Sequence, residues 1–140
     1  MGNGVRTHAP ESRLLLVEDS VDVRTLMTAI LEAEGYTVDS AGTAEEGLRL
    51  MKDRQYDLVL SDYALPGRTG AWMLREAVAR RLMACPDGII VTAHPYPRDT
   101  EGFEVIRKPL DFDAFLDHVR ERLDRGDTSG SEQPERCASH

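Results

Sequence analysis

Five short apolar stretches are spaced along the chain, and residues 14–17 (LLLV) form the most regular of them. An apolar run without polar interruption is typical of a strand that is buried on both faces of a parallel sheet. Further strands are predicted at residues 36–40, 57–61, 88–92 and 103–107. Because helical patterns separate most of these strands, the sequence predicts an α/β fold with a doubly wound, five-stranded parallel sheet.

Apolar residues at helical spacing predict the helices between the strands. Ser20 is the expected cap of the first helix and Gly35 its stop. The inner face of that helix is predicted from a period of about 3.6 residues. It comprises Val23, Leu26, Met27, Ile30 and Leu31. Thr43 and Glu46 form a capping box that predicts the start of the second helix, and further helices are predicted from residues 70 and 111.

The segment between the last two strands departs from this alternation. Residues 93–102 (AHPYPRDTEG) contain Pro95 and Pro97 where a helix would be expected. Each proline lacks an amide donor and disfavours helical geometry in the residue before it. The fourth helix of a regular five-helix pattern is therefore predicted to be lost or reduced to a loop.

The length and composition favour one soluble domain. The expected division is a flexible segment at 1–11, a domain at 12–124 and a disordered tail at 125–140. The formal net charge of −8 disfavours nucleic acid and anionic membrane as partners. No apolar stretch reaches the roughly 20 residues of a membrane span. Cys85 and Cys137 form no disulfide or metal pattern, so a cytoplasmic protein is expected.

Charged and hydroxyl side chains stand where the predicted strands end. Glu18 and Asp19 follow the first strand, Asp62 follows the third, Thr92 closes the fourth and Lys108 follows the fifth. Because parallel strands end at one edge of a sheet, these side chains are expected to gather there. Two carboxylates about 4 Å apart repel by roughly 4 kcal/mol at an effective dielectric of 20. The cluster therefore needs protonation, separation or a cation, and its oxygen ligands suit Mg²⁺, with Mn²⁺ as a substitute.

A divalent ion beside Asp62 would prepare this carboxylate to attack a phosphoryl group. Lys108 would then pair with a phosphate oxygen and the Thr92 hydroxyl would donate to another. Each residue also has an ordinary explanation on its own: Glu18 and Asp19 lie beside a helix cap, and Asp62 precedes a turn. The shared sheet edge is what favours the chemical interpretation.

The ordered motifs LLLVEDS, LVLSDYALPGRTG, IIVTA and IRKPL together resemble the receiver domain of two-component response regulators. The resemblance covers about residues 12–124. It implies the flavodoxin-like strand order 2-1-3-4-5 and a phosphoacceptor aspartate, Asp62, that is served by a histidine kinase. It also implies phosphate contacts from Thr92 and Lys108 and a cis Lys108–Pro109 bond. The implied metal ligands are Glu18, Asp19, Asp62 and the backbone carbonyl of Ala64.

The chain differs from that family in two places. The segment from Thr92 to Lys108 is shortened, so the signalling and dimerising face that the family builds there is expected to be altered or absent. Val105 stands where the family usually has a switch aromatic. Tyr96 or Phe103 would take the place of this switch aromatic, although core packing is the simpler role for Phe103.

His94 is either a group that orients water at the site or an ordinary loop histidine.

Three functions fit this pattern. The leading one is a stand-alone phosphoacceptor that signals by protein contact with an unidentified downstream protein or passes its phosphoryl group to a histidine phosphotransfer protein. A second is a scaffold or decoy that binds a partner regardless of phosphate. A third is a Mg²⁺-dependent phosphohydrolase, but Ala64 stands where such enzymes commonly place a second acid. A signalling domain, and not a turnover enzyme, is therefore expected.

Overall fold

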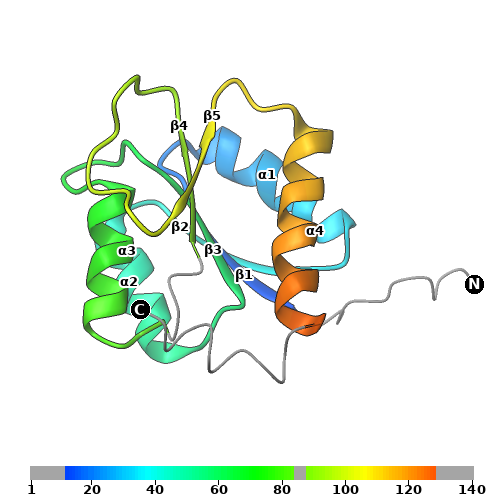
Figure 1. The fold of residues 1–140 in the computed structure, drawn as a ribbon, viewed down its shortest axis with the longest axis horizontal. Coiled ribbons are helices and arrows are strands. Elements are labelled where there is room, and N and C mark those ends of the chain that lie inside the picture. Colours follow the sequence, from blue (N-terminus) through cyan, green and yellow to red (C-terminus); the bar gives the residue numbers. More distant parts are fainter. Residues whose placement is uncertain (1–11, 84–87, 129–140) are drawn as a thin grey trace, which may run out of the picture.

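A computed structural model describes residues 12–83 and 88–128 of the chain (Figure 1). Its strands form one parallel sheet in the order β2-β1-β3-β4-β5, which confirms the predicted topology. The strands are β1 (Arg13–Val17), β2 (Thr37–Ala41), β3 (Leu58–Asp62), β4 (Gly88–Thr92) and β5 (Glu104–Arg107). The helices are α1 (Val21–Ala33), α2 (Ala44–Asp53), α3 (Gly70–Ala79) and α4 (Phe112–Thr128).

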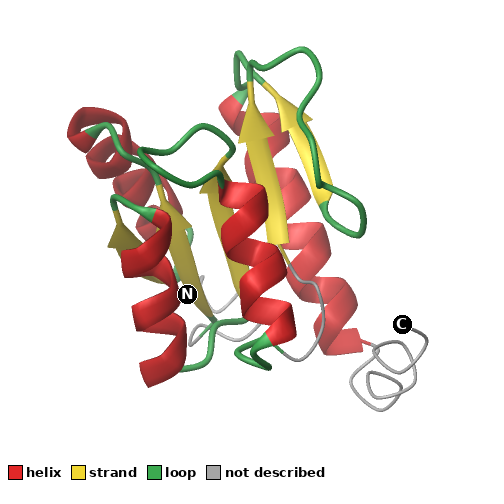
Figure 2. Cartoon of the chain, turned by 90° about the vertical axis from the view of Figure 1, so that its left-hand side faces the viewer, coloured by secondary structure: helices red, strands yellow, loops and turns green. Residues whose placement is uncertain are grey.

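Helices cover both faces of the sheet (Figures 1 and 2). Along β1, Leu14 and Leu16 pack into the core shared with α1 and α4, whereas Leu15 and Val17 pack into the core shared with α2 and α3. Successive side chains of a strand point to opposite faces. Burial on both faces therefore explains why this strand has no polar residue between Leu14 and Val17.

The predicted helix starts are confirmed at two caps. The side chain of Ser20 accepts a hydrogen bond from the amide of Val23 at the start of α1. At the start of α2, Thr43 accepts from the amide of Glu46. The carboxylate of Glu46 returns to the amide of Gly42, one residue earlier than in a regular capping box.

The predicted inner face of α1 is only partly correct. Met27 and Leu31 are buried, but Val23 is 39% and Leu26 is 50% exposed. Helical spacing identifies residues that share one face of a helix; it does not show how far the neighbouring elements cover that face. The exposed part of the face lies in the first turns of α1, which follow the acidic residues at the end of β1.

Residues 93–103, between β4 and β5, contain no helix, as the two prolines predicted. The fourth helix of the structure, α4, is the one expected to open at Asp111, and the Asp111 carboxylate accepts from the amides of Asp113 and Ala114. Helix α4 continues to Thr128, past the predicted domain end at residue 124. Residues 1–11 and 129–140, and with them Cys137, lie outside the described part of the chain, as does Cys85. None of the four described helices has the length and apolar composition that crossing a bilayer requires.

Candidate functional site

Three carboxylates meet at the carboxyl edge of the sheet, as the sequence predicted. Glu18 and Asp19 follow β1 and Asp62 ends β3, which is the neighbouring strand. One carboxylate oxygen from each residue lies within 4.8 Å of the others. Glu18 is 5% exposed, so its charge is turned toward the cluster and away from bulk water. This arrangement of hard oxygen donors fits a divalent cation such as Mg²⁺.

The electrostatics of the cluster also favour a cation. Burial raises the pKa of Glu18, and repulsion from Asp62 and Asp19 adds to the rise; the Ser20 amide, which donates to Glu18 at 3.1 Å, and Lys108 oppose it. Burial likewise raises the pKa of Asp62, assisted by the negative charge of Asp19 and opposed by Lys108. Both carboxylates thus cost free energy when they are ionised together, and a bound cation would lower that cost.

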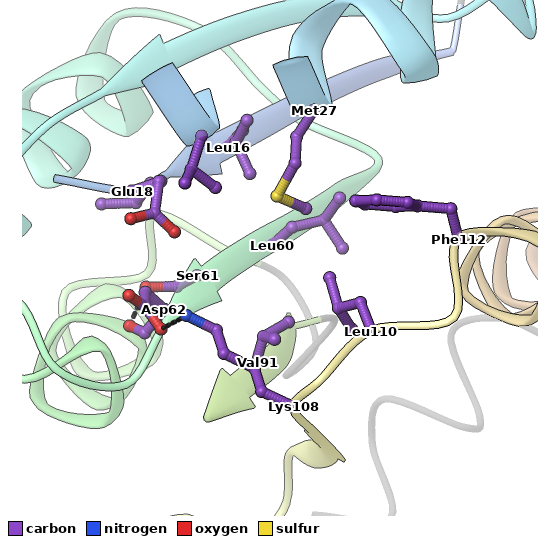
Figure 3. A pocket seen from close by; sticks show the side chains of 12 residues that line it. Leu16, Glu18, Met27, Leu60, Ser61, Asp62, Val91, Lys108, Leu110 and Phe112 are labelled. Carbon is purple, nitrogen blue, oxygen red and sulfur yellow. Dashed lines mark hydrogen bonds and ion pairs between the residues drawn. The ribbon is translucent and has the colours of Figure 1, made fainter. Parts of the chain in front are cut away.

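The predicted basic partner, Lys108, lies beside the carboxylate of Asp62. Lys108 Nζ is 3.1 Å from Asp62 Oδ1 (Figure 3). The peptide bond between Lys108 and Pro109 is cis, as the sequence resemblance implied. The Lys108 amide donates to the carbonyl oxygen of Thr92 at 2.9 Å, which ties the segment after β5 to the end of β4.

Thr92 closes β4 with its side chain buried. Its hydroxyl oxygen accepts a hydrogen bond from the amide of His94 at 2.8 Å. A hydroxyl that accepts one hydrogen bond still has its own proton to donate. Thr92 therefore keeps a donor for a ligand at this edge of the sheet.

The close approach of α3 to the end of β3, next to Asp62, depends on a glycine. Gly70 opens α3, and its amide donates to the carbonyl of Tyr63, one residue after Asp62. A Cβ atom on Gly70 would lie 2.2 Å from the carbonyl oxygen of Asp62 and 2.4 Å from the hydroxyl of Ser61. Only a residue without a side chain allows this approach of α3 to the end of β3.

Gly70→Ala is expected to destabilise the fold by about 1–3 kcal/mol because backbone at the site must shift to accept the new methyl group. The measurement is the free energy of unfolding in urea. Gly47→Ala is the matched control, because the new Cβ there meets side chains, Met73 Sδ at 2.6 Å and Val17 Cγ2 at 3.2 Å, and no backbone atom. Alanine also favours the helix interior by about 1 kcal/mol over glycine, so Gly47→Ala should cost less than Gly70→Ala. Equal losses in the two variants would contradict this account of Gly70.

The structure adds three residues that the sequence did not single out. Arg24 of α1 donates to the backbone carbonyl of Glu18 at 2.8 Å. Tyr63 and Arg107 contact residues 93–103 from positions directly after Asp62 and directly before Lys108. Adjacency to a predicted site residue was the one available signal for Tyr63 and Arg107. No pattern in the sequence pointed to Arg24.

A small cavity of about 50 Å³ opens beside the cluster (Figure 3). Glu18, Asp62 and Lys108 form its polar end. The rest of its lining is mostly apolar and includes Leu16, Val23, Met27, Leu60, Leu110 and Phe112. The cavity lies between the side chains of α1 and those that follow β5, and Val23 and Phe112 are both more than a third exposed.

Comparison with known proteins agrees with this fold. Residues 14–120 match the family model of the response regulator receiver domain. The transcriptional regulatory protein DltR of Streptococcus agalactiae is 32% identical over 79% of this chain and 51% of its own length. GlrR of Escherichia coli is 30% identical over 85% of this chain and 28% of its own length. The chain thus spans about half or less of the length of these curated relatives.

Solved structures show the same fold. A CheY-like receiver domain protein from Methanospirillum hungatei has a TM-score of 0.76 and 29% identity, over 85% of this chain and 98% of its own. The response regulator TrrA from Thermotoga maritima, solved in complex with Mg²⁺-BeF, has a TM-score of 0.72 and 29% identity. That likeness covers 80% of this chain and 99% of the TrrA chain.

Proposed function

This chain belongs to the response regulator receiver family, and on that premise we propose that it accepts a phosphoryl group on Asp62 from a histidine kinase or a histidine phosphotransfer protein. The observation that carries the proposal is the gathering of Glu18, Asp19 and Asp62 within 4.8 Å, with Lys108 Nζ 3.1 Å from Asp62. A carboxylate nucleophile flanked by two further acids and one fixed cation is suited to phosphoryl transfer. The proposed compartment is the cytoplasm.

In the proposed reaction, an Asp62 carboxylate oxygen attacks phosphorus and the bond between phosphorus and the donor's imidazole nitrogen breaks. Lys108 lies close enough to Asp62 to pair with a phosphoryl oxygen as a point charge. The Thr92 hydroxyl donates a hydrogen bond to another phosphoryl oxygen. The proposed ligands of Mg²⁺, or of Mn²⁺ in its place, are Glu18, Asp19, Asp62 and the backbone carbonyl of Ala64. The metal would supply charge neutralisation on the transferring oxygens.

Exposed apolar side chains beside the site support a protein as the phosphodonor. Val21, Val23 and Leu26 of α1 and Phe112 of α4 are 62%, 39%, 50% and 37% exposed. Val23 and Phe112 also line the cavity that ends at Asp62. A protein that brings a donor histidine to Asp62, at the polar end of this cavity, would cover Val23 and Phe112.

A phosphate-independent scaffold is the second candidate, favoured by Val105 at the switch position and by the missing helix between β4 and β5. Phosphohydrolase activity is disfavoured because Ala64, two residues past Asp62, offers no acid or base to a leaving group. We propose a signalling domain whose output is contact with a downstream protein or onward phosphotransfer. Dimerisation through the face formed by β5 and its neighbouring helices is not proposed, because one of those helices is absent from residues 93–103.

Incubation with acetyl phosphate and Mg²⁺ tests the proposed function. We expect intact-protein mass spectrometry to show one added phosphoryl group and excess EDTA to prevent the addition. Acetyl phosphate is a small donor, so the result does not depend on the identity of the partner. No adduct with acetyl phosphate or phosphoramidate would favour the scaffold. Many turnovers per molecule on a small phosphomonoester would favour the phosphohydrolase.

A further inference from the structure

Residues 93–103 stand where a helix between β4 and β5 was expected, and they are held to the sheet by Thr92 and by direct neighbours of Asp62 and Lys108. We call residues 93–103 the β4–β5 segment. In Figure 1 it is the yellow-green stretch that bows outward between the two strands, on the side of α3. Tyr96 within it is 81% exposed. Exposed segments with few buried contacts open at low free-energy cost, so the contacts that hold this one decide its conformation.

The first contact starts at Thr92. The amide of His94 donates to the Thr92 hydroxyl at 2.8 Å, and the imidazole Nδ1 of His94 in turn accepts from the amide of Tyr96 at 3.0 Å. The proposed role of Thr92 is to donate its hydroxyl proton to a phosphoryl oxygen. The same oxygen atom therefore links the phosphoryl group to the backbone of the β4–β5 segment.

The second contact is made by Tyr63, which follows Asp62 directly. The backbone amide of Tyr63 donates to the carbonyl of Val91 in β4 at 2.9 Å, and this bond holds the Tyr63 backbone against β4. Its ring lies 5.5 Å from the His94 ring at a tilt of 58°. Its hydroxyl accepts from the amide of Arg98 at 3.0 Å. Tyr63 thus reaches two points of the β4–β5 segment from the residue beside the phosphoacceptor.

The third contact is made by Arg107, which precedes Lys108 directly. Its guanidinium donates to the carbonyl oxygens of His94 and of Pro95, the latter at 3.0 Å. The planar guanidinium group, with several donors in fixed directions, can hold two neighbouring carbonyls at once. Arg107 therefore ties the residue directly before Lys108 to the backbone of the β4–β5 segment.

Val105 makes none of these contacts. It pairs with Ile90 in the sheet and packs, partly buried, against the core shared with α2 and α3. A short branched side chain held in this way has no ring to swing between two positions. A coupling between the site and the surface would therefore have to use other groups.

We propose that phosphorylation of Asp62 changes the conformation of the β4–β5 segment and that Tyr63, Thr92 and Arg107 transmit this change in place of a switch aromatic. The inference rests on the proposed function, because it requires Asp62 to carry the phosphoryl group. It adds to that function the surface that responds and the residues that link it to the site. Thr92 is itself a proposed phosphate contact, Tyr63 directly follows the proposed phosphoacceptor Asp62, and Arg107 directly precedes Lys108.

The test loads the full chain with Mg²⁺ and beryllofluoride, which mimics the phosphoryl group on aspartate, and follows backbone amides by NMR. We expect the amides of His94, Tyr96 and Arg98 to shift on loading in the unchanged protein. In Arg107→Ala we expect the shifts of His94 and Tyr96 to fall to less than half. In Tyr63→Phe, which keeps the ring and removes the hydroxyl, the Arg98 shift should fall in the same way.

Two controls keep the test specific. The ¹⁹F signal of bound beryllofluoride shows whether each variant loads, and only loaded samples are compared. Arg49→Ala, an exposed arginine of α2 whose ion pair is with Glu46, should leave the shifts of the β4–β5 segment unchanged. A reduction in Arg107→Ala with a full ¹⁹F signal then reports lost coupling and not lost binding.

The outcomes separate the inference from the proposed function. A bound ¹⁹F signal without shifts in the β4–β5 segment would overturn the inference and leave the proposed function in place. Full shifts in both Arg107→Ala and Tyr63→Phe would also overturn it, because other groups would then carry the coupling. Failure of the unchanged protein to bind beryllofluoride, together with no adduct from acetyl phosphate, would overturn both.

Discussion

Asp62→Asn is expected to abolish the phosphoryl adduct completely, the largest single effect that the site predicts. The amide of asparagine keeps the shape of the side chain but has neither the negative charge nor the nucleophilic oxygen that forms the acyl phosphate bond. Intact-protein mass spectrometry after incubation with acetyl phosphate and Mg²⁺ measures the loss. Asp62 is the one acid of the cluster that also pairs with Lys108, at 3.1 Å, so no neighbour has the same surroundings to replace it.

Asp53→Asn is the matched control for this variant. Asp53 ends α2, is exposed and lies outside the acidic cluster, so its variant should accept the phosphoryl group to the same extent as the unchanged protein. Circular dichroism should show both variants folded. An adduct of unchanged yield in Asp62→Asn would place the acceptor at another residue and contradict the assignment.

The sheet and the acidic cluster could be predicted from the sequence because both follow from simple geometry. Because β1 is buried on both faces, its residues form a continuous apolar run. Glu18 and Asp19 come directly after this run and show where the strand ends. Parallel strands bring such ends to one edge, and the structure places these two acids beside Asp62 as expected. The prolines at 95 and 97 likewise forbid a regular helix through local backbone chemistry alone.

The path of the β4–β5 segment could not be predicted in the same way. Its contacts join Tyr63 to Arg98 and Arg107 to His94, residues 35 and 13 positions apart. These hydrogen bonds depend on the path that residues 93–103 take beside the sheet. The segment has no helical or strand period and no cap, so its sequence does not predict that path. The exposure of Leu26 escaped prediction for a related reason, because its coverage depends on how far other elements extend along α1.

Glu18→Gln is expected to stabilise the metal-free protein at pH 7 and to weaken its response to Mg²⁺. Burial and the neighbouring acids raise the pKa of Glu18 above its ordinary value, so the folded state binds the proton more tightly than the unfolded state does. Stability contributed by this group is then present at low pH and is lost as pH rises through the raised pKa. Glu18→Gln removes the negative charge and therefore removes this loss of stability at high pH. The glutamine oxygen can still accept the hydrogen bond from the amide of Ser20.

Thermal unfolding followed between pH 4 and pH 8, with and without Mg²⁺, measures both effects. Without Mg²⁺, the melting temperature of Glu18→Gln should exceed that of the unchanged protein at pH 7, and the difference should shrink toward zero as pH falls through the raised pKa. Mg²⁺ at about 100 times its dissociation constant should stabilise the unchanged protein by about 2.7 kcal/mol. In a domain of this size, that corresponds to roughly 10 °C. The variant should need at least about tenfold more Mg²⁺ for the same rise, a loss of about 1.4 kcal/mol in binding.

Glu121→Gln, an exposed position in the middle of α4, provides the control for charge removal in general. Its melting temperature should stay close to that of the unchanged protein at every pH, and its response to Mg²⁺ should be full. A Glu18→Gln variant that is less stable than the unchanged protein at pH 7 without metal would mean that Lys108 and the Ser20 amide outweigh burial and repulsion. The acidic cluster would then be satisfied within the protein, and the electrostatic argument for a cation would fail.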